Sequence, residues 1–264
     1  MSICTMQAHP NQFIQTSRAG RVGVLAYGLV CYAVFLATFL YAIGFVVGVL
    51  TPTRLDDPAA APLGKALVIN LGLLTLFALQ HSIMARPAFK RRLHRVVPPS
   101  AERSTYVLAS SLALIALFAF WQPMGLMIWN VQPSTPRVAL YMLGGLGWLL
   151  VLASTFLINH FDLFGLRQAW LCFRGIPYRP LIMKTPGPYR LVRHPLYVGW
   201  LIAFWATPTM TLAHFVFALI TTVYILVAIQ FEERDLIAEH GESYRAYRRR
   251  VPMLVPRLWR RRKN

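Results

Sequence analysis

The sequence has few charged residues and very few acidic ones. Only 14% of its 264 residues are charged, and 9 Asp and Glu stand against 27 Lys and Arg. A soluble domain normally has about a quarter of its residues charged, so this composition argues against a soluble fold. The net charge of +18 is high enough to raise the question of nucleic-acid binding. However, the aromatic residues stand inside apolar runs rather than among the basic ones, so we expect no nucleic-acid partner.

Cysteine is scarce as well. The spacing of Cys4, Cys31 and Cys172 matches neither a metal site nor a disulfide framework. We therefore predict reduced thiols and no bound metal. The first 21 residues are polar, and the apolar run that follows is too long for the core of a cleavable signal peptide, so none is predicted.

Long apolar runs are what the sequence has in abundance, since 56% of its residues are hydrophobic and its mean hydropathy is +0.50. Four runs are long enough to cross a bilayer, at about 22–50, 64–85, 104–129 and 138–161. A further apolar block, 197–230, is interrupted near its middle by Ala-Thr-Pro-Thr-Met-Thr. These runs predict an integral membrane protein built from helices.

The distribution of basic residues predicts how these helices are oriented. The N-terminal segment, the 86–103 loop, the 164–196 connection and the region after 231 together contain 24 of the 27 Lys and Arg residues. Because Lys and Arg mark the cytoplasmic side, these regions and both termini are expected there, against anionic lipid headgroups. The 197–230 block then starts and ends on one side. We predict an all-α membrane protein with four full spans, a C-terminal helical hairpin and an amphipathic cytoplasmic helix; five spans ending in one long helix are the alternative.

The densest cluster of unusual residues lies where the hairpin begins. Residues 187–199 read Gly-Pro-Tyr-Arg-Leu-Val-Arg-His-Pro-Leu-Tyr-Val-Gly. Pro195 suits the first turn of a helix, and the N–H groups at such a helix start favour an anion. Arg190 and Arg193 add guanidinium groups, which bind carboxylates in a bidentate manner. This stretch therefore predicts a site for a ligand with an anionic group at the membrane surface.

Two adjacent glutamates follow the second arm of the predicted hairpin. If the hairpin folds back, Glu232 and Glu233 return beside Arg193 and His194. One carboxylate is then available to a ligand ammonium, and the other braces an arginine. A ligand that carries a carboxylate, an ammonium and a further cationic centre fits this set, and S-adenosylmethionine has these groups. Taken singly, each residue is more simply explained by packing at a membrane-helix end.

The stretch 193–199, a hairpin and the Glu232-Glu233 pair together resemble the C-terminal signature of the isoprenylcysteine carboxyl methyltransferase-like membrane enzymes, and 241–247 extends the match. The resemblance implies S-adenosylmethionine bound between the hairpin and the C-terminal helix. The candidate cofactor-binding residues are Tyr189, Arg190, Leu191, Arg193, His194, Pro195, Tyr197, Gly199, Glu232, Glu233, Tyr244 and Tyr247. A related module occurs in membrane sterol reductases, so an NADPH-dependent reductase is an alternative.

Three further stretches are similar to bacterial methanethiol S-methyltransferases and their NnrU-like relatives. They are 80–90 (Gln-His-Ser-Ile-Met-Ala-Arg-Pro-Ala-Phe-Lys), 99–106 (Pro-Ser-Ala-Glu-Arg-Ser-Thr-Tyr) and 159–166 (Asn-His-Phe-Asp-Leu-Phe-Gly-Leu). The resemblance spans nearly the whole chain. It implies methyl transfer from S-adenosylmethionine to methanethiol, giving dimethyl sulfide, in the inner membrane of a bacterium and with no obligatory protein partner. The alternatives are another acceptor, such as isoprenylcysteine or a lipid, and a non-catalytic NnrU-like protein.

A thiol acceptor needs its own site, because a thiol attacks well only as the thiolate. His81, His160 and Asp162 lie at the cytoplasmic ends of predicted spans, at the depth of the 187–199 stretch. We expect His160 as the base with Asp162 orienting it, and His81 as a second candidate. Arg167 is expected to stabilise the thiolate. Gln168, with the two histidines, is expected to contact the thiol.

These assignments divide the chain into two functional parts. Residues 1–168 are predicted to form the transmembrane scaffold and the acceptor side. Residues 169–264, which contain the cytoplasmic connection, the hairpin and the tail, are predicted to form the cofactor-binding module.

Overall fold

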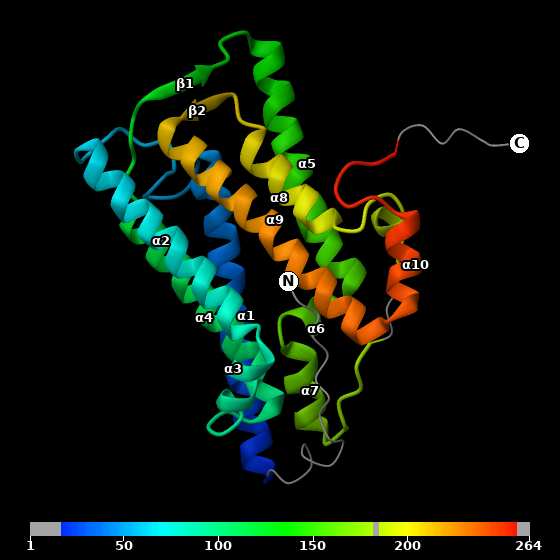
Figure 1. Cartoon of the computed structure of the whole chain (residues 1–264). Coiled ribbons are helices and arrows are strands. Elements are labelled where there is room, and N and C mark those ends of the chain that lie inside the picture. Colours follow the sequence, from blue (N-terminus) through cyan, green and yellow to red (C-terminus); the bar gives the residue numbers. More distant parts are fainter. Residues whose placement is uncertain (1–16, 182–184, 258–264) are drawn as a thin grey trace, which may run out of the picture.

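The computed structural model describes residues 17–181 and 185–257, and its apolar parts are helical (Figure 1). In this described part, five helices are long and apolar enough to cross a bilayer: α1 (Arg18–Val47), α2 (Leu63–Met84), α4 (Pro99–Phe120), α5 (Ser134–Ile158) and α9 (Leu212–His240). The prediction of an all-α membrane protein is confirmed. Cys4 and the basic end at 260–263 lie outside the described residues, whereas Cys31 and Cys172 are buried free thiols.

The shorter elements lie mainly at the two ends of this bundle (Figure 1). The short helices are α3 (Pro87–Leu93), α6 (His160–Leu163), α7 (Leu166–Arg174), the 3-10 helix η2 (Gly187–Arg190), α8 (Pro195–Trp205) and α10 (Glu242–Arg250). Helices α3, α6, α7 and α10 lie at one end, and two short strands, β1 (Met127–Asn130) and β2 (Thr209–Thr211), lie at the other. The described parts of the basic segments that we expected on one side of the membrane therefore share one end of the molecule.

The interruption of the last apolar block is a turn between two antiparallel helices. Helix α8 ends at Trp205, and α9 begins after Thr211, whose side chain accepts the N–H of His214 at 3.2 Å. A single unbroken final helix is thereby excluded. The arms are unequal, because α8 has 11 residues and α9 has 29. Helix α9 is long enough to cross the bilayer by itself, so the hairpin adds a fifth helix of spanning length to the four predicted spans.

The third predicted span extends too far. Helix α4 ends at Phe120, before Pro123, which cannot continue the hydrogen-bond ladder of a helix. The apolar residues that follow form β1, which pairs antiparallel with β2 in the hairpin turn, with Asn130 opposite Thr209. Apolar content alone does not separate a helix end from an adjoining short strand. This small sheet joins the α4–α5 connection to the turn of the hairpin.

Helix α8 packs closely along α5 because glycines face each other across the contact. A Cβ added to Gly199 would lie 2.8 Å from the backbone nitrogen of Val151, and one added to Gly147 would lie 2.6 Å from that of Ala203. Small residues allow such close approach of helices in lipid. Gly199 was predicted to contact the cofactor. The structure corrects this assignment, because the neighbouring helix occupies the space beside Gly199.

A buried polar network holds the turn end of the hairpin. The imidazole of His214 is fully buried, with Nδ1 2.8 Å from the carboxylate of Asp56 and Nε2 donating to the carbonyl of Phe204 at 2.9 Å. The hydroxyl of Thr211 donates to the other oxygen of Asp56 at 2.5 Å. A buried donor that loses its partner carries an uncompensated desolvation cost. The network therefore ties the loop after α1 to the start of α9.

Asp56→Ala is expected to lower the free energy of unfolding by about 2 kcal/mol, because it removes the acceptor of the His214 ring and of the Thr211 hydroxyl and N–H. Thermal unfolding of the purified protein in detergent measures this loss. The matched control is Asp57→Ala, since the Asp57 carboxylate accepts the N–H of Arg54 in an exposed turn. The control should change stability by less than about 0.5 kcal/mol. Equal losses in the two variants would contradict the role given to the network.

Candidate active site

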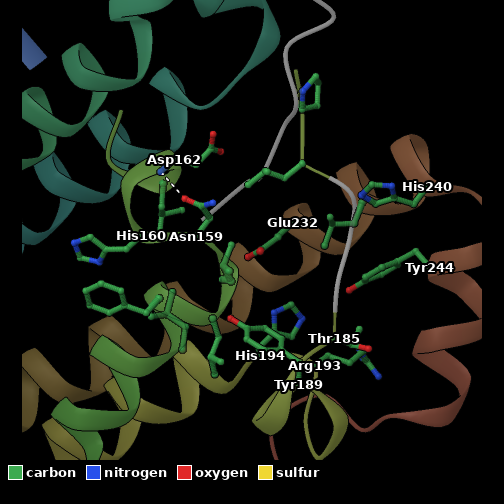
Figure 2. A pocket seen from close by; sticks show the side chains of 18 of the residues that line it. Asn159, His160, Asp162, Thr185, Tyr189, Arg193, His194, Glu232, His240 and Tyr244 are labelled. Atoms are coloured by element: carbon green, nitrogen blue, oxygen red, sulfur yellow. Dashed lines mark hydrogen bonds between the residues drawn. The ribbon is translucent and has the colours of Figure 1, made fainter. Parts of the chain in front are cut away.

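A cavity of about 710 Å³ opens at the end of the bundle that carries the short helices. One wall comes from the end of α5 and from α6, and the opposite wall comes from η2, the start of α8, the end of α9 and α10 (Figure 2). Glu232 lies between Asp162 on the first wall and His194 on the second. The cavity therefore joins the two regions that the sequence assigned to the acceptor and to the cofactor.

Most of the predicted cofactor-binding residues line this cavity. They are Tyr189, Arg193, His194, Tyr197, Glu232, Tyr244 and Tyr247. Five others lie outside its lining. Gly199 packs against α5, and Glu233 lies behind the wall; Arg190 and Leu191 are exposed, and Pro195 is buried in the first turn of α8. The structure gives no support to a cofactor contact by the last three, since a side chain directed to solvent or packed under a helix start does not reach the cavity.

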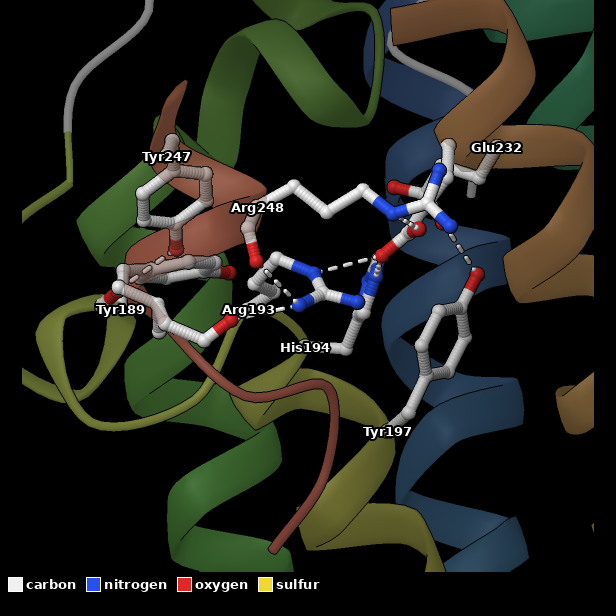
Figure 3. A network of polar contacts seen from close by, with 9 residues as sticks. Tyr189, Arg193, His194, Tyr197, Glu232, Tyr247 and Arg248 are labelled. Atoms are coloured by element: carbon white, nitrogen blue, oxygen red, sulfur yellow. Dashed lines mark hydrogen bonds and ion pairs between the residues drawn. The ribbon is translucent and has the colours of Figure 1, made fainter. Parts of the chain in front are cut away.

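Figure 3 shows Arg193, His194 and Arg248 close together, and the carboxylate that all three contact belongs to Glu233. Its side chain is only 5% exposed. Arg193 Nε donates to its Oε1 at 2.7 Å, and His194 Nε2 donates to the same oxygen at 3.1 Å. Arg248 Nε lies 3.2 Å from Oε2. Because Glu233 does not line the cavity, it acts as a brace for residues that do, which is a correction to its predicted cofactor contact.

Glu232 faces the cavity, one residue before the brace. The hydroxyl of Tyr197 donates to its Oε2 at 2.7 Å. Consecutive residues of a helix point about 100° apart, so Glu232 and Glu233 meet different partners. The sequence analysis expected one carboxylate to be available to a ligand and the other to brace an arginine. Glu233 binds Arg193, as expected of one of the two carboxylates, and Glu232 lines the cavity, which is the position that the expected ligand contact requires.

The tail after α10 closes over the start of α8. The backbone N–H groups of Arg193 and His194 donate to the carbonyls of Pro252 at 2.8 Å and Met253 at 3.2 Å. The hydroxyl of Tyr247 donates to the carbonyl of Tyr189 at 2.6 Å. Burial raises the pKa of Tyr247 to about 12, so this hydroxyl stays protonated and remains a donor at neutral pH. The tail thus fixes the backbone conformation of the cavity wall.

His160 lines the opposite wall, and both of its ring nitrogens are engaged. Thr155 gives its only hydroxyl proton to the carbonyl of Leu152 at 2.7 Å, so it accepts from Nδ1 of His160 at 2.9 Å. Nε2 is then the acceptor and receives the hydroxyl of Tyr32 at 2.8 Å. The ring stacks on Phe156 with centroids 4.2 Å apart. Burial lowers the pKa of His160, which keeps the ring neutral at neutral pH.

Asp162 lines the cavity but does not pair with His160. Its carboxylate accepts from Arg167 at 2.7 Å and from the Tyr178 hydroxyl at 3.3 Å, and Arg167 also donates to the carbonyl of Arg179 at 3.2 Å. Burial, and then the charge of Asp162, raise the pKa of Tyr178 to about 12. The predicted His160–Asp162 pair is therefore wrong. Arg167 does not line the cavity; it holds the connection after α7 against α6.

Two predicted thiol contacts also lie outside the cavity lining. Gln168 is buried in α7, where its Nε2 donates to the backbone carbonyl of Asp162 at 3.1 Å. His81 Nδ1 lies 3.1 Å from the hydroxyl of Ser110, and its ring centre is 5.0 Å from that of Tyr106. Both side chains pack against neighbouring elements, so the structure does not support the direct contacts that we predicted for them.

Several cavity residues were missed from the sequence, namely Arg103, Asn159, Tyr178, Thr185 and His240. Asn159 has a φ of 146°, in a region that side chains rarely adopt, and its side chain accepts the N–H of Asp162 at 3.1 Å. The available signal was an Asn placed before the first turn of a helix, which is a common capping position. The other four are isolated polar residues that follow no spacing rule.

Comparisons with known proteins show similarity to methyltransferases. The phospholipid methyltransferase (PEMT) family matches residues 141–242. A protein of Crocosphaera subtropica named methanethiol S-methyltransferase is 55% identical over 245 residues, 93% of this chain and 96% of the relative. A Mycobacterium tuberculosis protein of the same name is 55% identical over 232 residues, 88% of this chain and 95% of the relative. Nurim of Xenopus laevis is 33% identical over 176 residues, 63% of this chain and 61% of nurim. No solved structure matches the chain.

Proposed function

This chain belongs to the methanethiol S-methyltransferase family, and we propose that its cavity binds S-adenosylmethionine beside methanethiol and catalyses the methyl transfer that gives dimethyl sulfide. The chain is thus a methyltransferase in an integral-membrane scaffold. One observation carries the proposal: Glu232 lies in the same cavity as His194 and the start of α8. A carboxylate and a helix N-terminus suit the two charged ends of an amino acid.

The second wall of the cavity has the groups that such a donor requires. A volume of about 710 Å³ lies within the usual range of ligand pockets. The first turn of α8, which contains Leu196 and Tyr197, directs backbone N–H groups toward a carboxylate. Glu232 suits an ammonium, and the rings of Tyr189 and Tyr244 offer aromatic surface to a nucleoside. When bound, the donor supplies a methyl group on a reactive sulfonium.

The first wall suits a small, apolar acceptor. Phe156, Leu157, Phe161 and Leu163 line it together with His160. Because both ring nitrogens of His160 are already bonded, we propose that the ring positions the acceptor rather than removing its proton. Holding two reactants in line accounts for much of the rate enhancement in such a transfer. Residues 1–168 thus form the acceptor side and residues 169–264 the donor side.

We also propose that this end of the molecule faces the cytoplasm from the inner membrane of a bacterium. Most of the Lys and Arg residues lie in the segments at this end, and such a bias marks the cytoplasmic side. The exposed side chains of Arg91 and Arg92 in α3 are suited to anionic lipid headgroups. Cysteine modification from either side of sealed vesicles, at introduced positions 91 and 57, tests the orientation.

Purified protein in detergent, given labelled S-adenosylmethionine and methanethiol, should release labelled dimethyl sulfide into the headspace. Isoprenylcysteine and a lipid amine serve as competing acceptors, and calorimetry compares binding of S-adenosylmethionine with that of NADPH. Failure of both turnover and donor binding would refute the proposal. Turnover on one of the other acceptors alone would retain the methyltransferase and refute methanethiol as its acceptor. Binding of NADPH alone would favour a reductase.

A further inference from the structure

Arg103 is a cation at the cavity that the predicted chemistry did not use. It belongs to the 99–106 stretch, and within that stretch it is the residue that lines the cavity. Its side chain is half-buried, and its guanidinium carbon lies 5.9 Å from the centre of the Tyr106 ring, one helical turn further along α4. A charged residue inside a membrane-spanning helix is costly and often functional.

The carboxylate of Glu102, next to Arg103 in the sequence, is bound by residues other than Arg103. Glu102 is buried, and its two oxygens lie 3.1 Å from Lys90 Nζ and 2.5 Å from His94 Nε2. This cluster fastens α3 to the start of α4 and turns the Glu102 charge away from the cavity. Arg103 is also near the positive end of α4, where a cation gains nothing from the helix dipole. The local structure therefore gives no reason for a positive charge at this position.

The carboxylates that line the cavity do not pair with Arg103. Asp162 is bound by Arg167, and Glu232 accepts the hydroxyl of Tyr197. Among residues 17–181 and 185–257, no carboxylate forms an ion pair with Arg103. The titratable groups that sense its charge are His81 on α2, Tyr106 on α4 and Tyr178 in the connection after α7. His81 and Tyr106 belong to elements of the acceptor side, and Tyr178 donates to Asp162 on the acceptor wall. An anion bound beside Arg103 would therefore lie on the acceptor side of the cavity.

We propose that Arg103 binds methanethiol as its thiolate and is a catalytic residue of the acceptor site, an inference that rests on the proposed function. An alkyl thiol is mostly protonated at neutral pH, and only the thiolate is a good nucleophile. A guanidinium at an apolar cavity wall favours the anion more strongly than the same charge does in water. The role that the sequence analysis gave to Arg167 thus passes to Arg103, because Arg167 is bound to Asp162.

The transfer balances with this assignment. The thiol proton passes to water, and the thiolate sulfur forms a bond to the methyl carbon. The bond from that carbon to the sulfonium sulfur breaks, and its electron pair stays on the donor sulfur. One negative and one positive charge disappear, dimethyl sulfide leaves as a neutral molecule, and Arg103 keeps its charge throughout. The guanidinium therefore favours the thiolate and does not bind the neutral product strongly.

The test compares Arg103→Gln, Arg103→Lys and the control Arg91→Gln, which removes an equal charge from the exposed face of α3. In Arg103→Gln, kcat/KM for methanethiol should fall about 100-fold, as when one donor to a developing charge is removed. The midpoint of the rise of kcat with pH should move to higher pH. Arg103→Lys should keep the midpoint near that of the wild type. Calorimetry should show unchanged affinity for S-adenosylmethionine in all three variants.

Three results would overturn the inference while leaving the proposed function intact. If Arg103→Gln loses affinity for S-adenosylmethionine and keeps its pH midpoint, Arg103 serves the carboxylate of the donor. If Arg103→Gln matches Arg91→Gln in both kinetics and binding, Arg103 has no part in the reaction. If thermal unfolding shows that Arg103→Gln does not fold, the test uses Arg103→Lys instead. A shift in the pH midpoint of kcat in that variant would overturn the inference. Failure of the wild type to methylate methanethiol or bind the donor refutes the proposed function instead.

Discussion

Replacement of Glu233 with alanine is expected to abolish binding of S-adenosylmethionine and to destabilise the cofactor end of the protein. The variant removes the shared acceptor of Arg193 and His194, which both lie in the cavity wall. Arg193 is 9% exposed, so its guanidinium would be left nearly buried without its carboxylate. Breaking such a buried pair by removing one partner typically costs about 3 to 5 kcal/mol. Calorimetry measures the loss of binding, and thermal unfolding measures the loss of stability.

Two other glutamates provide controls with different expected outcomes. Glu242→Ala removes a carboxylate that Arg249 binds at 2.6 Å on the exposed surface of α10, and solvent-exposed pairs of this kind contribute little to stability. Glu232→Gln keeps an acceptor for the Tyr197 hydroxyl but loses the charge that faces the cavity. It should weaken donor binding by about tenfold or more with little change in stability. Equal stability of Glu233→Ala and wild type would show that Glu233 is not a brace.

His160→Ala should lower kcat by about 100-fold while donor affinity stays unchanged, because the ring forms part of the acceptor wall and small misplacements of a reactant are costly. The cavity contacts proposed for the donor come from the opposite wall, so its binding should not depend on this ring. Steady-state kinetics with methanethiol measures the first effect, and calorimetry with S-adenosylmethionine measures the second. A parallel loss of donor affinity would place His160 in the donor site instead.

The pH dependence separates positioning from proton removal at His160. Burial lowers the pKa of the ring below its ordinary value of about 6.5, so the imidazole is uncharged from neutral pH upward. If the ring only positions the acceptor, the fall in kcat of His160→Ala should be the same factor at each pH in this range. A factor that changes with pH would identify the ring as the proton acceptor. Tyr32→Phe, which leaves Thr155 and Phe156 holding the ring, should have a smaller effect.

The sequence determined the membrane architecture because its signals are local. A run of about 20 apolar residues has few alternatives to a membrane helix, and the Lys and Arg count grouped the segments that share one end of the structure. The Thr-Pro-Thr break at 207–209 predicted the turn between α8 and α9. Once that turn was inferred, the return of Glu232 and Glu233 to Arg193 and His194 followed from geometry. The family resemblance is confirmed by relatives that are 55% identical to the chain.

The acceptor side depended on which side chains meet, and spacing along the chain does not contain that information. His160 and Asp162 are two residues apart, which suggested a pair. Residues two apart in a helix point about 200° from each other, so the two side chains have different partners, Tyr32 and Arg167. The strand β1 was not predicted for a similar reason. Its partner β2 lies about 80 residues further along the chain, so the local sequence does not indicate the pairing.

Only the tertiary structure decided which basic and acidic groups face the cavity. Sequence reasoning placed the 187–199 stretch and the glutamates together, but it gave Glu232 and Glu233 no order and gave Arg103 no role. The packing of α9 against α8 directs Glu232 to the cavity and Glu233 behind it. The contact of α3 with α4 neutralises Glu102 and leaves Arg103 at the wall. Burial and charge neutralisation arise from contacts between distant segments, and these contacts select the chemistry of the site.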